Sequence, residues 1–473
     1  MNQTNAGVDF NFSFAPGVSD DQMLGFMIAG DIVSQHLADS YQGRNVEINI
    51  HVDVSDEYLP DNIVGASFPA IETSIRNRYS KLYDAIQDDI TTEADQIAAD
   101  NLLDRRAIDI LVGNEVIHHN FRTQVTRANL KALGMVDGDS SELDGYIMIN
   151  NFDGELWSYD YLGDPQEGTL DFLSMAQHEI FHALGFISGA NHTEDTVDNS
   201  IGNRIYNMST MDLFRYSTES AALGINNLGY GEEAFFSING QETTLGLATG
   251  VDHQISHFVE SHDPNRALMT PTIALAERLS ITEDDLSVLD AIGWDVVDPG
   301  EIDMATMYSD AQGKLASAQI IDRESEVEET ILNSSAYYWG RWGRDSTGGG
   351  WWQEAYFMEL ESTVEVTENT DPDYESTAEV AEDADNGYEF IYRMMASGVH
   401  HQPESIDIMM QEPEDDEPES TDITEQESEL YESDTKNFLE VLETVVDSPQ
   451  DNSWNNSPES NWWNNAPENN LVG

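Results

Sequence analysis

The most specific chemical pattern in this 473-residue chain is the run His178-Glu179-Ile180-Phe181-His182. On a helix, side chains four residues apart lie on one face, so both imidazoles can bind a single zinc ion. The adjacent carboxylate can then accept a proton from zinc-bound water as hydroxide attacks a polarised carbonyl. Coincidence is the alternative, because the chain holds 12 histidines. The place of the run within a regular helical pattern favours the metal interpretation.

A catalytic zinc site needs a third protein ligand and one open position. Gly185 follows His182 by three residues and extends the pattern to HExxHxxG, the start of a longer zinc-binding signature. In that signature a ligand follows the glycine by three residues, but Ser188 stands there and is a poor zinc ligand. The third ligand must come from elsewhere, and the candidates are His192, His253, His257 and His262.

Two short runs near one of these candidates resemble motifs of a known family. Ile255-Ser256-His257-Phe258 is followed, after a polar stretch, by Leu268-Met269-Thr270-Pro271. This arrangement resembles the leishmanolysin branch of the metzincin zinc metalloproteases. There a long insertion precedes a third histidine in a Ser-His-aromatic context, and a Met-turn of the form Leu-Met-small-Pro follows. The resemblance implies that His257 is the third zinc ligand and that Met269 supports the site from beneath. From the residues alone, a surface-loop histidine and an ordinary core methionine are the alternatives.

The resemblance covers about residues 8–296 in outline, with specific motifs only from residue 144 onward. Asp144–Asn150 looks like the edge strand along which metzincins hold an extended peptide, so the substrate-strand candidates are Tyr146, Ile147 and Met148. Three further segments look like secreted bacterial metalloproteases of this kind: Asp212–Tyr216, Phe236–Gly240 and Leu286–Trp294. The chain departs from the family pattern because it lacks cysteine, has Phe258 in place of a tryptophan, and has no tyrosine directly after Met269.

Hydrophobic periodicity indicates the elements that would position these residues. Helical spacing predicts helices over Met23–Ala38, Pro69–Asp100, Thr123–Leu133, Thr169–Ile187 and Thr282–Ile292. Alternation of apolar and polar residues predicts a strand over Asn45–Val54, and an apolar run with turn residues at both ends predicts a second strand over Asp144–Asn151. We therefore expect an α+β fold, a zincin/metzincin-like catalytic domain with a mixed twisted sheet and an active-site helix.

The charge of the chain excludes several classes of protein. There are 91 acidic and 19 basic side chains, a net charge of -72, so attraction to nucleic acid or to an anionic membrane is excluded. The absence of cysteine excludes a disulfide framework and thiol catalysis. No apolar run is long enough to insert into a membrane as a helix.

The acidic residues are distributed unevenly and suggest three regions. Residues 1–300 contain 49 acidic and 13 basic side chains, and residues 301–473 contain 42 and 6 in a much shorter segment. We expect a metallopeptidase-like domain over 1–300. Residues 301–359, with a helix over Met304–Asn333 and an aromatic, glycine-rich stretch, would pack on this domain or link from it. Residues 360–473 read as a largely disordered, acidic, low-complexity tail with Trp-Asn-Asn repeats at 454–461 and 463–470.

The sequence indicates the cellular location of the protein and any binding of further cations less directly. An acidic body suits a salty or calcium-containing exterior, which favours an extracellular or cell-surface protein, although no ordinary secretory signal is visible and a cytoplasmic location is the alternative. Calcium binding by a loop with Asp195, Asp198 and Asn199 is open, but no spaced loop signature supports it.

Two functions remain to be compared. The first is a zinc-dependent endopeptidase that acts on polypeptides, with zinc held by His178, His182 and His257 and with Glu179 as the general base. The second is a non-catalytic surface or interaction protein on the zincin scaffold, whose acidic tail contacts cations or partners. The intact Glu179 favours the enzyme, whereas Ser188 would favour the second function if His257 did not reach the metal.

Overall fold

The computed structural model describes residues 7–55, 59, 62–72, 78–152, 156–192, 205, 207–241, 243, 245–251, 253–322, 351–352 and 356–360. All of these belong to one compact unit, Met1–His400. Helices and strands are mixed along this unit, and its main sheet contains both parallel and antiparallel pairs, so the expected mixture of α and β structure is confirmed. The expected acidic tail lies outside the described residues beyond residue 360, as do Asp195, Asp198 and Asn199.

The main sheet has the strand order β15-β18-β4-β8-β3-β1-β16, and β2, β7 and β17 are short additional partners. Neighbouring strands are parallel along one half of the sheet, in the order β8, β3, β1 and β16. In the other half, β4 is antiparallel to both β8 and β18. The strands span Val8–Phe14 (β1), Ser40–Tyr41 (β2), Arg44–Ser55 (β3), Ile63–Glu72 (β4), Val125–Thr126 (β7), Gly145–Asn150 (β8), Thr272–Ile273 (β15), Gln319–Ile320 (β16), Trp351–Trp352 (β17) and Tyr356–Leu360 (β18).

β8 is an internal strand of this sheet, which corrects one prediction. Ile147 pairs with Val52 of β3 on one side and with Ser67 of β4 on the other. All six residues of β8 are buried. A strand that is paired along both edges cannot add a further peptide, so the prediction that Tyr146, Ile147 and Met148 form the substrate-binding edge is wrong.

The amphipathic pattern over Pro69–Asp100 divides between three elements. It contains the end of β4 and two helices, α2 (Tyr79–Asp88) and α3 (Glu93–Asn101). Every residue of β4 is buried, so the strand shows no alternation of apolar and polar side chains. Strands that are buried on both faces give continuous apolar runs, and periodicity alone does not separate them from helices.

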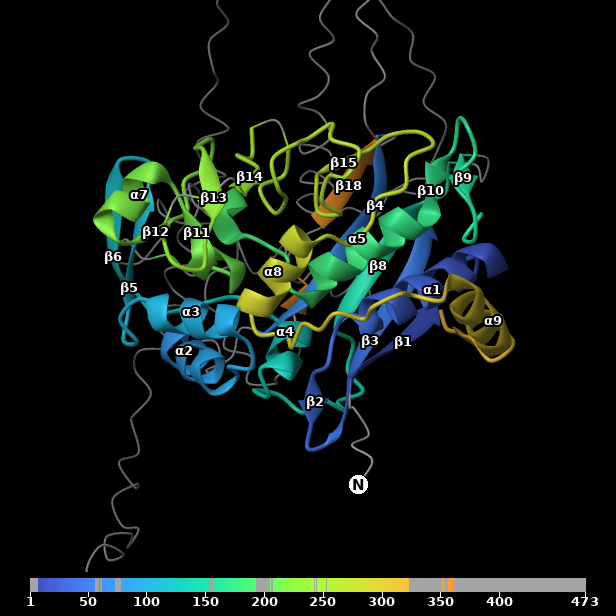
Figure 1. The fold of residues 1–473 in the computed structure, drawn as a ribbon, viewed down its shortest axis with the longest axis horizontal. Helices are drawn as coiled ribbons and strands as arrows, with labels where there is room; N and C mark the ends of the chain where they lie inside the picture. Colours follow the sequence, from blue (N-terminus) through green and yellow to red (C-terminus); the bar gives the residue numbers. More distant parts are fainter. Residues whose placement is uncertain are drawn as a thin grey trace, which may run out of the picture. The chain divides into compact units, whose positions relative to one another are not determined.

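Two long helices cover the sheet near its centre (Figure 1). α1 (Asp20–Gln35) packs against β1 and against α5 (Phe172–Leu184), which in turn packs against β4. α1 begins at a capping box formed by Ser19 and Gln22. Between the two helices Phe26 meets Phe172 edge-on, with ring centroids 5.7 Å apart. The buried face of α5 is therefore part of the main core.

The chain beyond residue 300 contributes to the same body. α9 (Met304–Leu315) packs against α1, and β16 pairs with β1. The helix expected over Met304–Asn333 thus ends within its first half, because strand β16 follows it. None of the described helices is both long and apolar enough to cross a membrane.

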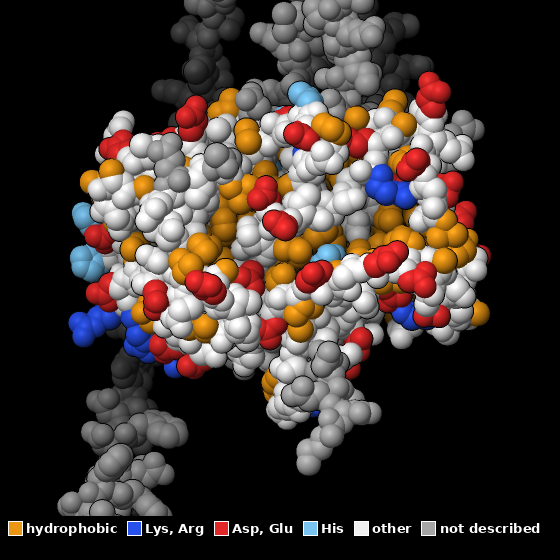
Figure 2. All heavy atoms as spheres, in the orientation of Figure 1, with side chains coloured by type: hydrophobic (Ala, Val, Ile, Leu, Met, Phe, Trp, Pro, Cys, Tyr) orange, Lys and Arg blue, Asp and Glu red, His pale blue; other side chains and the backbone are white. Residues whose placement is uncertain are grey.

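The remaining elements flank the main sheet. Smaller sheets join β9 to β10, β5 to β6 and β12, and β11 to β13 and β14. Their strands are Ile108–Val112 (β5), Glu115–Asn120 (β6), Trp157–Ser158 (β9), Leu170–Asp171 (β10), Arg215–Tyr216 (β11), Asn226–Asn227 (β12), Ala234–Phe236 (β13) and Gly246–Leu247 (β14). The other helices are α4 (Arg127–Ala132), α7 (Thr218–Leu223) and α8 (Glu283–Ala291), with 3-10 turns η3 (Gly189–His192) and η4 (Met211–Phe214). Figure 2 shows acidic side chains over much of one face, with lysine and arginine in only a few places.

Candidate metal centre

The helix that carries the first two histidines, α5, has a firmly held start. Asp171 is its N-cap, and the carboxylate accepts hydrogen bonds from the backbone N–H and the hydroxyl of Ser174, at 3.0 and 2.7 Å. Arg278 donates to both oxygens of the same buried carboxylate, at 2.6 and 3.0 Å. The bidentate ion pair ties the start of α5 to the segment that precedes α8.

The end of α5 requires a glycine. Gly185 has a φ of 121°, a conformation that residues with a Cβ rarely adopt. A Cβ at this position would also lie 3.2 Å from Ile292 and 3.3 Å from Asn129. The turn at Gly185 sends the chain back so that the Phe186 carbonyl accepts a hydrogen bond from His182 Nδ1 at 2.7 Å.

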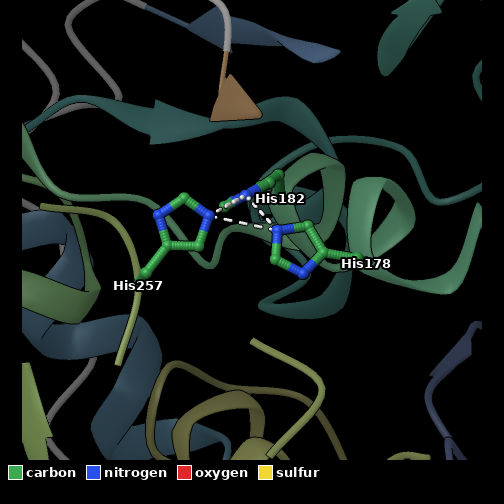
Figure 3. A group of neighbouring side chains, drawn as sticks. All are labelled: His178, His182 and His257. Atoms are coloured by element: carbon green, nitrogen blue, oxygen red, sulfur yellow. Dashed lines mark hydrogen bonds between the residues drawn. The ribbon is translucent and has the colours of Figure 1, made fainter. Parts of the chain in front are cut away.

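Three imidazoles converge at the buried face of α5. The Nε2 atoms of His178 and His182 lie 3.1 Å apart, and His257 Nε2 lies 3.1 Å from the first and 3.2 Å from the second (Figure 3). All three residues are completely buried. Among the described residues, this is the group of histidine and carboxylate side chains whose ligand atoms approach closely enough to hold one metal ion.

The outer nitrogen of each ring fixes its tautomer. His178 Nδ1 lies 2.9 Å from the Leu268 carbonyl, and His257 Nδ1 lies 2.9 Å from the Gln254 carbonyl. His182 Nδ1 is bonded in the same way to the Phe186 carbonyl, at 2.7 Å. A carbonyl oxygen can only accept a hydrogen bond, so each Nδ1 carries the proton. In the neutral rings the three Nε2 lone pairs then face one another, and a cation at their centre is the species that satisfies all three.

Burial keeps the rings of His178 and His182 neutral. It lowers the pKa of His178 to about 4, and the hydrogen bond to the Leu268 carbonyl opposes this only in part. Burial also lowers the pKa of His182 well below its usual value, with the neighbouring rings of His178 and His257 adding to the effect. Near neutral pH the lone pairs are therefore available to a metal. Nitrogens bound tetrahedrally at about 2.05 Å from a metal lie about 3.3 Å apart, close to the observed separations.

The loop that carries His257 is held on two sides. Ser256 Oγ accepts a hydrogen bond from the backbone N–H of Ser188 at 2.8 Å, and the Phe258 N–H donates to the Met269 carbonyl at 2.9 Å. Ser188, which occupies the place of a ligand in the longer signature, instead donates its hydroxyl to Asp212 at 2.6 Å. Ser188 thus contributes to the position of the third histidine and not to the ligand set.

The turn at Leu268–Met269 is fixed by a carboxylate from α8. Asp285 accepts the N–H groups of Leu268 and Met269, both at 2.9 Å. It also forms a capping box with Thr282, which starts α8. Burial raises the pKa of Asp285 to about 6. Met269 is completely buried, and Leu268 supplies the carbonyl that orients the ring of His178.

The other histidines that sequence alone allows as third ligand lie elsewhere. His253 Nε2 approaches Glu260 at 4.0 Å, and His262 is exposed. The side chain of His192 lies outside the described part of the chain. The structure therefore brings His257, and neither His253 nor His262, to the pair on α5.

Glu179 directly follows His178 on α5. It is completely buried, and its Oε1 accepts a hydrogen bond from the backbone N–H of Met358 at 3.3 Å. Burial raises the pKa of this carboxyl well above its usual value, and the Met358 hydrogen bond opposes the shift. Its other oxygen, Oε2, has no hydrogen-bond partner within the described residues. A carboxyl group in this setting is poised to exchange a proton with a reacting group.

The sequence does not indicate the contribution of three supporting residues, which are Arg278, Asp285 and Met358. Asp285 is visible in sequence only as a capping residue, and nothing near Met358 marks it as a neighbour of α5. Comparisons of the chain with models of protein families, with curated proteins and with solved structures find no match. The assignment of function therefore depends on the geometry of this site.

Proposed function

We propose that this protein is a zinc-dependent endopeptidase with a zincin-like fold. One observation carries the proposal: three buried imidazoles, each oriented by a backbone carbonyl, converge within 3.2 Å, and the helix that supplies two of them also carries a buried glutamate that contacts a peptide N–H. A purely structural histidine cluster has no need of a carboxylate in that place. The residues are those that the HExxH motif and the family resemblance together imply for metal binding and proton transfer.

The donor set supports zinc. Neutral imidazole nitrogen is a preferred ligand for zinc, and three protein ligands with one open position are typical of catalytic zinc sites. His178, His182 and His257 would hold the ion. When bound, zinc would polarise the substrate carbonyl and lower the pKa of a water molecule at the site.

The chain's own residues then divide the remaining work. Glu179 accepts the proton of the attacking water and passes it to the nitrogen of the departing amine. The carbonyls of Leu268, Phe186 and Gln254 keep the rings in the tautomer that binds the metal. Asp285 holds the turn at Leu268 and Met269, and this turn keeps the Leu268 carbonyl in place as the hydrogen-bond partner of His178.

The proposed substrate is a polypeptide in extended form. β4 and β15 each pair with β18, so the sheet beside Glu179 already accommodates an extended segment of backbone. Main-chain hydrogen bonds of this kind bind peptides without requiring one particular side-chain sequence.

Metal content and hydrolysis together test the proposal. We expect about one zinc per chain, and hydrolysis of casein that a chelator abolishes. Glu179→Gln should keep the zinc and lower the rate by about 10²–10⁴-fold, because it removes the proton acceptor without removing a ligand. Glu115→Gln, at an exposed position on β6, is the matched control and should change neither quantity.

Full zinc loading without hydrolysis of any peptide in a diverse library would contradict the proposal. It would favour the alternative of a non-catalytic protein that keeps the metal for stability.

A further inference from the structure

The segment Tyr356–Leu360 forms a strand that reaches Glu179 of the candidate site. β18 lies between β4 and β15, antiparallel to the first and parallel to the second (Figure 1). It also packs against α5, the helix that carries Glu179. An extended piece of this chain therefore runs past the site in the manner of a bound peptide.

The register of β18 places one residue opposite the glutamate. Met358 pairs with Gly65 of β4, and the pairing shifts between Met358 and Glu359, which pairs with Ile63. At this irregular point the Met358 N–H donates to Glu179 Oε1 at 3.3 Å. The side chain of Met358 is completely buried.

Gly65 permits the close approach of the three elements. A Cβ at Gly65 would lie 2.7 Å from Met175 Sδ and 3.2 Å from Glu179 Cγ. A larger residue there would push α5 away from β4 or displace the glutamate. The absence of a side chain leaves Glu179 against β4, within reach of the backbone of the strand paired with it.

We propose that the Phe357–Met358 bond of this chain is the site's own substrate and is hydrolysed within the same molecule. The inference rests on the proposed function. In peptide hydrolysis the amide nitrogen becomes the leaving amine and must gain a proton, and the group that delivers it must lie within hydrogen-bond reach. Met358 N is the backbone nitrogen in contact with Glu179. The peptide bond that Glu179 can protonate is therefore the one between Phe357 and Met358.

The reaction balances with water alone. Water adds to the carbonyl carbon of Phe357 and gives up a proton to Glu179. The bond from that carbon to Met358 N breaks, and the nitrogen receives the proton to become a free amine. The products are a body that ends in the carboxylate of Phe357 and a fragment, residues 358–473, that begins with Met358. Cleavage would separate the acidic extension from the body.

The burial of Met358 also indicates a preference for other substrates. Met358 is packed into the main hydrophobic core, and such a position accepts an apolar residue of similar size and rejects a charge, whose burial without a partner is unfavourable. We therefore infer that peptides are cut on the amino side of methionine-sized apolar residues.

The test begins with the full-length, zinc-loaded protein and intact-mass spectrometry. We expect a fragment with Met358 at its amino terminus, formed at a rate that does not change on 100-fold dilution, because the reaction is intramolecular. Glu179→Gln should prevent it. Met358→Asp should slow it by at least 10-fold and Met358→Leu should not. Met307→Asp, on α9, is a control methionine outside the site and should leave the cleavage unchanged.

A second measurement does not depend on activity. In metal-free Glu179→Gln protein, the amides of Met358–Leu360 should exchange slowly with deuterium, because they lie within the sheet. Met358→Asp should raise their exchange at least 10-fold. A synthetic peptide with the sequence of residues 352–363, added in excess, should do the same by competing for the site. Rapid exchange in the unmodified segment would overturn the proposal.

Several results separate this inference from the proposed function. Zinc-loaded protein that hydrolyses casein but retains the Phe357–Met358 bond overturns the inference alone. If the Phe357–Met358 bond stays intact and truncation at Asp322 makes casein hydrolysis faster, the inference is also overturned. That result would show that β18 only obstructs the site. A rate proportional to protein concentration overturns the intramolecular step. Zinc loading with neither self-cleavage nor casein hydrolysis overturns both proposals.

Discussion

Two regions of this protein gather side chains that commonly bind metals, and they differ in how those side chains are arranged. The histidine centre consists of His178, His182 and His257, whose ligand atoms meet within 3.2 Å. The second region, here the aspartate cluster, is made of carboxylates from five positions that influence one another's ionisation: Asp39, Asp89, Asp95, Asp290 and Asp295. Among the described residues, only the histidines bring three ligand atoms close enough together to hold one ion.

The aspartates are directed by local hydrogen bonds. Thr91 Oγ1 donates to Asp295 at 2.7 Å, and Thr92 Oγ1 donates to Asp290 at 3.0 Å. Burial, followed by the nearby aspartates, raises the pKa of Asp39 and of Asp89 to about 8 and that of Asp290 to about 7. Several of these carboxylates thus have hydrogen-bond partners of their own, and burial and crowding favour the protonated forms of Asp39, Asp89 and Asp290.

The difference shows what distinguishes a built site from a concentration of charge. Neutral imidazoles do not repel one another strongly, and their outer nitrogens are held by carbonyls that point the lone pairs at one place. Carboxylates at close range repel, and without a cation or a proton the repulsion is not relieved. Convergence with fixed orientation is the property that the histidine centre has and the aspartate cluster lacks.

Removal of one histidine should have the largest effect. His257→Ala should lower zinc affinity by several orders of magnitude and abolish casein hydrolysis, since two protein ligands do not make a stable catalytic site. The measurement is metal content after dialysis at equal protein concentration. His118→Ala, at an exposed histidine on β6 that pairs with Asp109, should change neither quantity.

Retention of zinc by His257→Ala, or its loss from Asp295→Ala, would reverse the roles assigned to the two regions.

A change behind the ligands should have a smaller effect. Asp285→Asn keeps the shape of the side chain but places an amide donor opposite backbone N–H donors at Leu268 or Met269. We expect a loss of about 1–3 kcal/mol in the free energy of unfolding and a 10- to 100-fold loss in zinc affinity. Urea unfolding and competitive zinc titration measure the two. Asp284→Asn, at an exposed neighbour, is the control, and equal effects of both variants would show that Asp285 does not orient the site.

The metal-binding helix was the easier half of the site to predict. A regular apolar spacing, an aspartate at the start and a glycine at the end are local signals, and α5 follows them closely. His257 lies 75 residues beyond His182, and its contribution depends on a loop held by Ser188 and Met269. The sequence indicated this residue only through its resemblance to a known motif, because spacing does not reveal which loop returns to a helix.

The strands around the site were harder to predict. β4 is buried along its whole length and contains Gly65 and Pro69, so it gives neither alternation nor a clear strand composition. Apolar and polar residues alternate little in β8, and only the family resemblance implies an edge position for it. Pairing with β3 and β4 makes β8 an internal strand. β18 joins β4 from a distant part of the chain, and long-range pairing of this kind leaves no local signal.

The two regions should also respond to pH in opposite directions in metal-free protein. The folded-state pKa of His178 is lowered to about 4, so its contribution to stability is present above the unfolded value of about 6.5 and is lost as pH falls toward 4. For Asp39 and Asp89 the folded-state pKa is raised to about 8, so their contribution is present below the unfolded value of about 4 and is lost as pH rises toward 8.

Between pH 7 and pH 9 the histidines are neutral in both states, and only the aspartates contribute. The urea midpoint should therefore fall over this range, and Asp39→Asn should reduce the fall because the buried side chain no longer ionises. On the order of 1 kcal/mol is expected from this substitution at pH 9. A midpoint that rises with pH in the unmodified protein would contradict the assignment of raised pKa values to the cluster.

The smallest expected effect is that of calcium on the aspartate cluster. Oxygens bound to one calcium ion lie at about 2.4 Å from it and so within about 5 Å of one another. No three carboxylates of the described residues meet that condition, so calcium should act on this region only by screening. Millimolar calcium should then raise the melting temperature of metal-free protein no more than magnesium at equal ionic strength. An increase in melting temperature that is specific to calcium and disappears in Asp290→Asn would show that the carboxylates rearrange around an ion. Proximity of the carboxylates, without prior orientation, would then be enough to form a site here.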